Sequence, residues 1–280
     1  MMQKTVVLAV VLVLAVAGVT AIVVAGRSNT APDAKVSRSE KPGARETEPQ
    51  QTGKGMAAVE RVAGAEKYLF AFFRKEENDR AAAMRKVVEA AVGRVADRAD
   101  WIEVDVTDAS EKPIVEKSDL DRAPMPLVLA LAPNGAIMGG FPTEVGEQEL
   151  LEAFGSPCTE ACMKWLQKNK LVFLCVQNAG TGSNEAAVQG VHDFKADTRF
   201  TQATEIVRLD PADAEEADFL EQLQIDPGTQ EAVTVFLAPP GVPIAKYEGA
   251  TDKDVLVAAL EKASSVCGPG GCGPSGCCPK

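Results

Sequence analysis

The stretch APMPLVLALAPNGAIMGGF, residues 123–141, decides the fold. Two apolar runs flank a Pro-Asn-Gly turn, which predicts two strands joined as a hairpin because Asn-Gly suits a positive φ. KYLFAFF at 67–73 and WIEVDV at 101–106 predict two further buried strands. Apolar residues spaced at helical intervals over 84–95 predict a helix between these strands, and EQELLEAF at 147–154 predicts a closing helix.

The same order of elements occurs a second time, roughly 105 residues further along the chain. Both copies contain Leu-Ala-Pro-x-Gly, at 131–135 and 237–241. The matching segments of the second copy are KLVFLCV at 170–176, TEIVRLD at 204–210, AVTVFLAPPGVPIAKYEG at 232–249 and DKDVLVAALEKA at 252–263. This repeat predicts two α/β domains of one fold, which we place at residues 56–155 and 156–265.

The order of elements and the stretch 123–141 resemble the thioredoxin-like superfamily. The resemblance implies two tandem thioredoxin-like domains, with Pro126 as the structural cis-proline beside the family's active site. It also implies a Cys-x-x-Cys motif directly after the first strand of each domain, where a helix N-terminus stabilises a thiolate. Residues 74–80 and 177–186 occupy that position without a cysteine, and Ala232 replaces the proline in the second copy. We therefore expect neither domain to exchange dithiols by the family's mechanism.

The two loops carry weaker alternatives. The Gly-rich loop NAGTGSNE at 178–185 could meet an anion through its backbone, but it matches neither a P-loop nor Gly-x-Gly-x-x-Gly. A flexible loop with a Ser or Asn helix cap is the favoured interpretation. In the first copy, Glu76, Glu77 and Asp79 could form a carboxylate site, but acidic residues in a first helical turn complement the helix dipole, and we favour that interpretation.

The N-terminal residues form a candidate membrane segment. Residues 5–26 form an uncharged stretch, and about 20 residues suffice for a helix to cross a bilayer core. Its length favours a retained anchor over a cleaved signal peptide in segment 1–26. Residues 27–55, rich in Pro, Gly, Ser, Thr and charge, predict a disordered linker. Basic residues lie on both sides of the segment, so the distribution of positive charge does not predict its orientation. We expect the folded part of the chain to lie on the extracytoplasmic side, in the periplasm or at the cell surface. A cytoplasmic location is the alternative.

Charge and histidine content exclude several function classes. The formal net charge of -11 argues against a nucleic-acid partner, because phosphate neutralisation needs clustered Lys and Arg. The single histidine, His192, excludes a multi-His metal site and argues against a Ser-His-Asp mechanism. We expect His192 to be a surface or packing residue.

The cysteines give the remaining candidate site. The tail at 266–280 is rich in Gly, Pro and Cys, and a mobile thiolate cluster suits a soft metal ion such as zinc or copper(I). Cys158 and Cys162 follow Ser156 and Pro157, which predict a helix start, so they lie one turn apart. They could assist the metal, form a strained disulfide, or pack against the core. Cys175, inside a predicted central strand, is expected to be an inert packing residue. The candidate metal ligands are Cys267, Cys272, Cys277 and Cys278, with Cys158 and Cys162 as helpers.

Three functions remain open from the sequence. Superfamily members without Cys-x-x-Cys commonly serve as binding platforms, so the resemblance favours a membrane-tethered, non-catalytic scaffold for a protein partner, with a metal-binding tail. The second candidate is a thiol-disulfide redox enzyme that uses only the tail cysteines. The third is a structural envelope protein cross-linked through its tail. Whether the chain is an enzyme is left open among these three.

Overall fold

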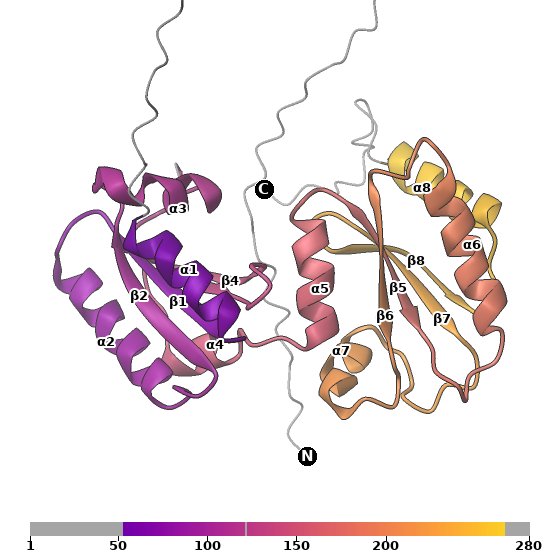
Figure 1. Ribbon diagram of the computed structural model, residues 1–280, viewed down its shortest axis with the longest axis horizontal. Coiled ribbons are helices and arrows are strands. Elements are labelled where there is room, and N and C mark those ends of the chain that lie inside the picture. The colour runs from indigo at the N-terminus through magenta and orange to yellow at the C-terminus, as the bar shows by residue number, and fades with distance from the viewer. Residues whose placement is uncertain (1–52, 121, 267–280) are drawn as a thin grey trace, which may run out of the picture. The chain divides into compact units, whose positions relative to one another are not determined.

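The computed structural model describes residues 53–120 and 122–266, which form two four-stranded sheets, one from each copy of the repeat (Figure 1). The predicted membrane segment, the predicted linker up to residue 52 and the four tail cysteines lie outside these residues. No helix of the described part is long and apolar enough to cross a membrane.

The first domain contains a mixed sheet in the order β2-β1-β3-β4. Strand β1 is parallel to β2 and antiparallel to β3, which in turn pairs antiparallel with β4. The elements, in chain order, are α1 (Lys54–Gly64), β1 (Tyr68–Arg74), α2 (Asp79–Gly93), β2 (Ala99–Asp105), η1 (Ala109–Glu111), α3 (Lys112–Lys117), β3 (Leu127–Leu131), β4 (Ile137–Pro142) and α4 (Glu147–Leu151).

The second domain repeats this topology in the order β6-β5-β7-β8. Strand β5 is parallel to β6 and antiparallel to β7, and β7 pairs antiparallel with β8. Its elements are α5 (Pro157–Leu166), β5 (Leu171–Val176), α6 (Asn184–Ala196), β6 (Thr204–Leu209), η2 (Ala214–Glu216), α7 (Ala217–Gln222), β7 (Val233–Ala238), β8 (Val242–Glu248) and α8 (Lys253–Val266).

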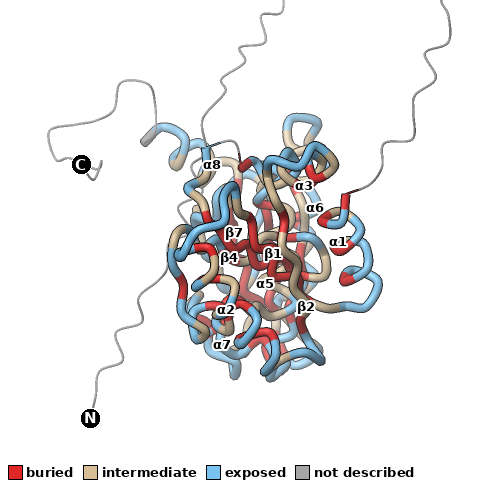
Figure 2. Tube along the Cα trace, turned by 90° about the vertical axis from the view of Figure 1, so that its left-hand side faces the viewer, coloured by how far each residue is buried: buried red, intermediate tan, exposed pale blue. Residues whose placement is uncertain are grey.

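Each sheet is covered by helices on both faces, so its central strand is buried on both sides (Figure 2). Alternation along β1 sends Phe70 and Phe72 into one core cluster and Leu69, Ala71 and Phe73 into another. In β5 the same alternation separates Phe173 and Cys175 from Val172, Leu174 and Val176. The continuous apolar runs of the sequence are therefore central strands that serve two cores each.

The predicted strands and long helices are confirmed, together with the repeat. Three helices were not predicted: α1, α3 and α7. Helices α3 and α7 have six residues each, too few for a helical period to be recognised. Helix α1 begins at Lys54, so the predicted linker boundary at residue 55 is wrong by the first turn of this helix. The closing helix α4 ends at Leu151 instead of 154.

The hairpin between β3 and β4 is confirmed, but its turn uses one residue of positive φ. Gly135 has φ +84°, whereas the φ of Asn134 is not positive. The Asn134 side chain instead accepts a hydrogen bond from the amide of Ala136 at 2.9 Å. The Gly135 amide donates to the carbonyl of Ala132 at 2.8 Å, which closes the turn. The corresponding turn of the second domain contains a cis Pro239–Pro240 bond and Gly241 at φ +137°.

Candidate functional site

In the first domain, the loop after β1 and the segment before β3 line a cavity of about 190 Å³. The Met125–Pro126 peptide bond is cis, as the sequence predicted. This cavity lies where the resemblance places the Cys-x-x-Cys motif. The residues that line it are Arg74, Lys75, Glu76, Asn78, Met125 and Pro126.

The loop after β1 ends in a side-chain cap. Asn78 accepts a hydrogen bond from the amide of Ala81 at 2.9 Å, and helix α2 begins at Asp79. Only Asp79 therefore lies in the first turn. The expectation that Glu76 and Glu77 also complement the helix dipole is wrong, because both precede the cap.

Glu77 instead belongs to a network of two arginines and three carboxylates. Arg74 bonds Glu103, Asp105 at 3.0 Å and, more loosely, Glu77 at 3.5 Å. Arg85 bonds Glu77 at 2.7 Å and Glu103 at 2.6 Å. Burial alone would raise the pKa of Glu103, but hydrogen bonds from Arg85 and Arg74 lower it. The network holds the loop with paired charges, and none of its groups is a thiol that could exchange disulfides.

Met125 has an unpaired backbone in this cavity. Neither its amide nor its carbonyl forms a hydrogen bond with another residue that the structure describes. The next residue, Pro126, does have a partner, because its carbonyl accepts from the amide of Thr143 at 2.7 Å. Met125 is half-buried and lines the cavity, so its backbone has two hydrogen-bonding groups without a described partner at this wall.

The second domain closes the equivalent position with its own backbone. The Gly182 amide donates to the carbonyl of Gln230 at 2.7 Å, and the Ala232 amide donates to the carbonyl of Gly182 at 3.0 Å. These bonds form an isolated parallel bridge between Gly182 and Glu231. A Cβ on Gly182 would lie 2.9 Å from the Glu231 carboxylate, so the glutamate side chain would have to shift to admit a larger residue there.

The Gly-rich loop at 178–185 is held by its own side chains. Thr181 donates to the Asn184 side chain at 2.6 Å and accepts from the Asn178 amide at 3.0 Å. The Asn184 amide group also donates to the carbonyl of Asn178 at 2.7 Å. Ser183 occupies the N-cap position of α6, as predicted, but at φ +57° and without the side-chain hydrogen bond that such a cap usually forms.

Cys158 and Cys162 lie at the start and middle of α5, whose predicted beginning at Ser156 and Pro157 is confirmed. Cys162 is buried in the core, and the Cys158 thiol donates to the carbonyl of Arg208 at 3.2 Å. Burial, helped by the Glu216 carboxylate, raises the pKa of Cys158 to about 12. Burial likewise raises the pKa of Cys162 to about 12. Both thiols stay protonated in this setting, whereas metal ligation needs a thiolate.

The other two residues named from the sequence take the expected places. Cys175 is buried in β5, and burial raises the pKa of its thiol to about 11, which makes it an inert packing residue. His192 lies on the exposed face of α6. In the described part of the chain, no group of three or more His, Cys, Asp or Glu side chains is placed to hold a metal ion. The tail ligands Cys267, Cys272, Cys277 and Cys278 lie outside that part.

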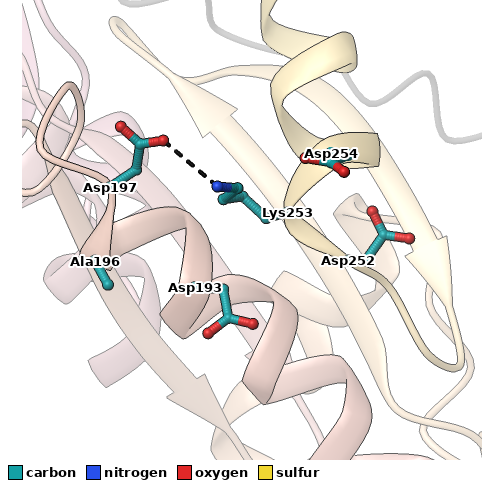
Figure 3. Close-up of a pocket in the computed structure, with 6 residues that line it drawn as sticks. All are labelled: Asp193, Ala196, Asp197, Asp252, Lys253 and Asp254. Atoms are coloured by element: carbon teal, nitrogen blue, oxygen red, sulfur yellow. Dashed lines mark ion pairs between the residues drawn. The ribbon is translucent and has the colours of Figure 1, made fainter.

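An acidic depression between α6 and α8 is a second, more open cavity, of about 510 Å³ (Figure 3). Lys253 lies among four carboxylates there and forms an ion pair with Asp197 at 3.7 Å. Arg199 also binds Asp197 at 2.9 Å and, by hydrogen bonding, lowers the pKa of that carboxyl. The depression is lined by Asp193, Ala196, Asp197, Asp252, Lys253 and Asp254.

Two buried glutamates were missed by the sequence analysis. Glu111 accepts from the amides of Lys54 and Gly55, at 2.9 Å each, and so fastens the start of α1. Glu216 accepts from the amide of Cys158 at 2.9 Å and from the Ser156 hydroxyl at 2.5 Å. The signal was present, because Asp-x-x-Asp-x-x-Glu occurs at 105–111 and again at 210–216.

Comparison with known proteins gives structural matches only. No protein-family model and no curated protein matches the chain. The first two thioredoxin domains of Saccharomyces cerevisiae Eps1p match 82% of this chain and 99% of that one, at 7% identity and a TM-score of 0.28. Human ERp44 matches 73% of this chain and 55% of its own, at 9% identity and a TM-score of 0.32. The AhpF NTD_N/C domain of Enterococcus faecalis matches 73% and 98%, at 11% identity and a TM-score of 0.26.

The fold class rests on the chain's own features. The order of elements along the chain and the cis-proline before β3 are those that the resemblance implied, and both domains form the same mixed sheet of parallel and antiparallel strands. The chain carries two tandem thioredoxin-like domains.

Proposed function

We propose that this chain is a non-catalytic binding protein whose first domain takes up an extended segment of a partner polypeptide beside Pro126. The observation that supports it is the unpaired backbone of Met125 at the wall of an open cavity. An unpaired amide and carbonyl next to a strand form a template for pairing with another chain.

The second domain fills the corresponding space with its own backbone. There, Gly182 pairs with the residues on both sides of Glu231, which lies at the position equivalent to Met125. In the first domain no described residue takes the place of Gly182, and Pro126 has no N–H with which to form the same bridge. A partner segment would therefore pair with the amide and carbonyl of Met125 itself, and we expect the second domain, where Gly182 occupies this space, not to bind such a segment.

Dithiol exchange is not proposed for either domain. The loop after β1 carries the arginine network where a thiolate would be needed, and the described thiols have raised pKa values. The unpaired backbone of Met125 beside the cavity supports recognition of a polypeptide instead of covalent chemistry.

Hydrogen exchange of the full chain with a peptide selected from a random library tests this proposal. Binding at the proposed position slows exchange of the Met125 amide and leaves the Ala232 amide unchanged. N-methylation of the peptide at alternate backbone positions should abolish binding, because it removes the donors that pair with Met125. A selected peptide that binds without slowing exchange in residues 122–127 would overturn the proposal.

For the tail, we propose a soft-metal site. Thiolates are the ligands that zinc and copper(I) prefer. A native mass spectrum of the full chain, compared with a chain ending at residue 266, tests it: metal mass should disappear with the tail. A mass short by two hydrogens per bond would favour tail redox chemistry, and a reductant-sensitive dimer would favour cross-linking. The proposed ligands are Cys267, Cys272, Cys277 and Cys278; Cys158 and Cys162, whose raised pKa values keep their thiols protonated, are no longer proposed as helpers.

We also propose that residues 5–26 anchor the protein, with the body on the extracytoplasmic side. The uncharged length of the segment supports the anchor. Resistance to alkaline extraction would support a span, and digestion of the body by protease added outside intact cells would support the orientation. Release at alkaline pH would contradict the anchor.

A further inference from the structure

Three lysines surround one tryptophan where α5 leads into β5. The ammonium groups of Lys168 and Lys170 lie 4.8 and 4.9 Å from the centre of the Trp165 ring, and that of Lys164 lies 5.7 Å away. Trp165 is partly exposed and Lys168 is exposed. We call these four residues the Trp165 cluster.

The charge of the cluster is only partly neutralised. Lys170 donates to Glu205 at 2.5 Å, but Glu205 is shared with Lys195 at 2.9 Å. Lys164 and Lys168 form no ion pair with another described residue. A site of net positive charge thus stands out on a chain whose formal net charge is -11.

We propose that the Trp165 cluster binds the anionic headgroups of the membrane to which the chain is anchored. Indole rings favour the headgroup level of a bilayer, and lysine ammonium groups beside them are attracted to anionic lipid. The proposal rests on the predicted anchor at 5–26, requires anionic lipid in the leaflet that faces the body, whichever side of the membrane that is, and is independent of peptide binding at Met125.

Other occupants fit less well. The chain's own segments outside the structure are not acidic: residues 27–52 hold five basic and four acidic residues, and 267–280 hold one lysine and no Asp or Glu. A stable interface with a protein partner would need further apolar or aromatic residues around Trp165 that exclude water from the contact. Among the described residues, the exposed large hydrophobic side chains are Val242 in β8 and Val255 in α8, neither of them in the cluster.

A weak contact between the Trp165 cluster and lipid would be sufficient for binding, because the predicted anchor at 5–26 already holds the chain at the membrane. The linker predicted from the sequence, if it is disordered over residues 27–52, would have a root-mean-square length of about 28 Å and would keep the body near the surface at an effective concentration on the order of millimolar. Each lysine near an anionic surface then changes the bound population about fivefold. Contact through the cluster would give a negatively charged body one defined orientation against a negatively charged membrane.

Tryptophan quenching tests the proposal on the full chain in nanodiscs. Trp101→Phe leaves Trp165 as the only tryptophan, since the chain has two. With brominated phosphatidylcholine plus phosphatidylglycerol, Trp165 emission should be quenched at low salt and recover at high salt; with phosphatidylcholine alone it should stay unquenched. Lys164→Gln with Lys168→Gln should lower the bound population about 25-fold. The matched control, Lys86→Gln with Lys117→Gln, changes two exposed lysines elsewhere and should keep the quenching.

A second measurement needs no variant. In the unaltered chain, acetylation of Lys164 and Lys168 by an amine reagent should be slower in anionic than in neutral nanodiscs, while that of Lys86 stays the same. Equal quenching and equal acetylation in the two lipids would overturn the proposal. A shift of Trp165 emission by polyglutamate but not by anionic lipid would overturn it in favour of an acidic protein partner. Peptide binding at Met125 is measured separately in the same variants, so the two proposals fail independently.

Discussion

Two buried glutamates, Glu111 and Glu216, hold the first helix of each domain by its free amides. Helix N-termini leave backbone donors without partners, and a buried carboxylate is a strong acceptor for them. Space is limited at this contact, because a Cβ on Gly55 would lie 2.8 Å from both Glu111 and Ile114. The position of α1 is therefore determined by a side chain more than fifty residues away in the sequence.

Replacing Glu111 tests that contact. Glu111→Gln keeps one acceptor but presents an amide donor to the second backbone amide, and we expect it to lower the free energy of unfolding by about 1–3 kcal/mol. Glu111→Ala should cost at least as much. Denaturant unfolding measures both, with the exposed residue in Glu116→Gln as control. A change no larger than that of the control would contradict the role of Glu111.

The arginine network predicts a dependence of stability on pH. Hydrogen bonds from Arg85 and Arg74 outweigh burial and lower the pKa of Glu103 in the folded state. Glu103 therefore contributes its full share to the free energy of unfolding above its pKa in the unfolded chain, about 4.3. That contribution is lost as pH falls through the lower pKa of Glu103 in the folded state. Unfolding free energies measured from pH 7 downwards should fall more steeply for the unaltered chain than for Glu103→Gln. Parallel curves would show that Glu103 does not contribute.

At the scale of elements, the second domain depends on close packing of α6 against the start of α8. Gly190 of α6 is buried, and a Cβ there would lie 2.1 Å from the carbonyl oxygen of Thr251. Backbone atoms cannot rotate away as a flexible side chain can. Glycine is therefore required at this position by contact between elements, although it weakens the helix in isolation.

A pair of glycine substitutions separates the effect of close packing from the effect of glycine's low helix propensity. Gly190→Ala should destabilise the second domain by several kcal/mol, because helix and loop must move apart. Gly93→Ala, at the end of α2 with nothing within 4 Å of the added Cβ, should be neutral or stabilise by up to about 1 kcal/mol. Thermal unfolding of both variants measures the difference, and similar midpoints would contradict the packing argument.

At the scale of the whole molecule, residues of the two repeats contact each other around Tyr68. Its hydroxyl donates to Glu160 at 2.5 Å and accepts from the amide of Gly155 at 2.9 Å. The Gln167 side chain both accepts from the Ile137 amide at 2.9 Å and donates to its carbonyl at 2.6 Å, which occupies the backbone of the edge strand β4.

The two tyrosines of the chain allow a matched test of this contact. Tyr68→Phe removes a buried hydroxyl with two partners, and we expect a loss of about 1–3 kcal/mol together with faster exchange of the Gly155 amide. Tyr247→Phe removes a hydroxyl for which no hydrogen bond is seen among the described residues, and should change stability by less than about 0.5 kcal/mol. Unchanged exchange at Gly155 in Tyr68→Phe would contradict the assigned bond.

The sequence by itself determined the repeat, the buried strands and the long helices, because apolar periodicity and turn residues act over short distances along the chain. The cis-proline position followed from the resemblance to the thioredoxin-like superfamily. It also showed that no cysteine follows the first strand of either domain. Only the tertiary structure decided which backbone groups remain unpaired. Met125 and Glu231 occupy equivalent places in similar sequences, yet Gly182 closes only the second. The arginine network and the buried glutamates likewise join residues far apart in the chain, and such pairings depend on how the elements pack.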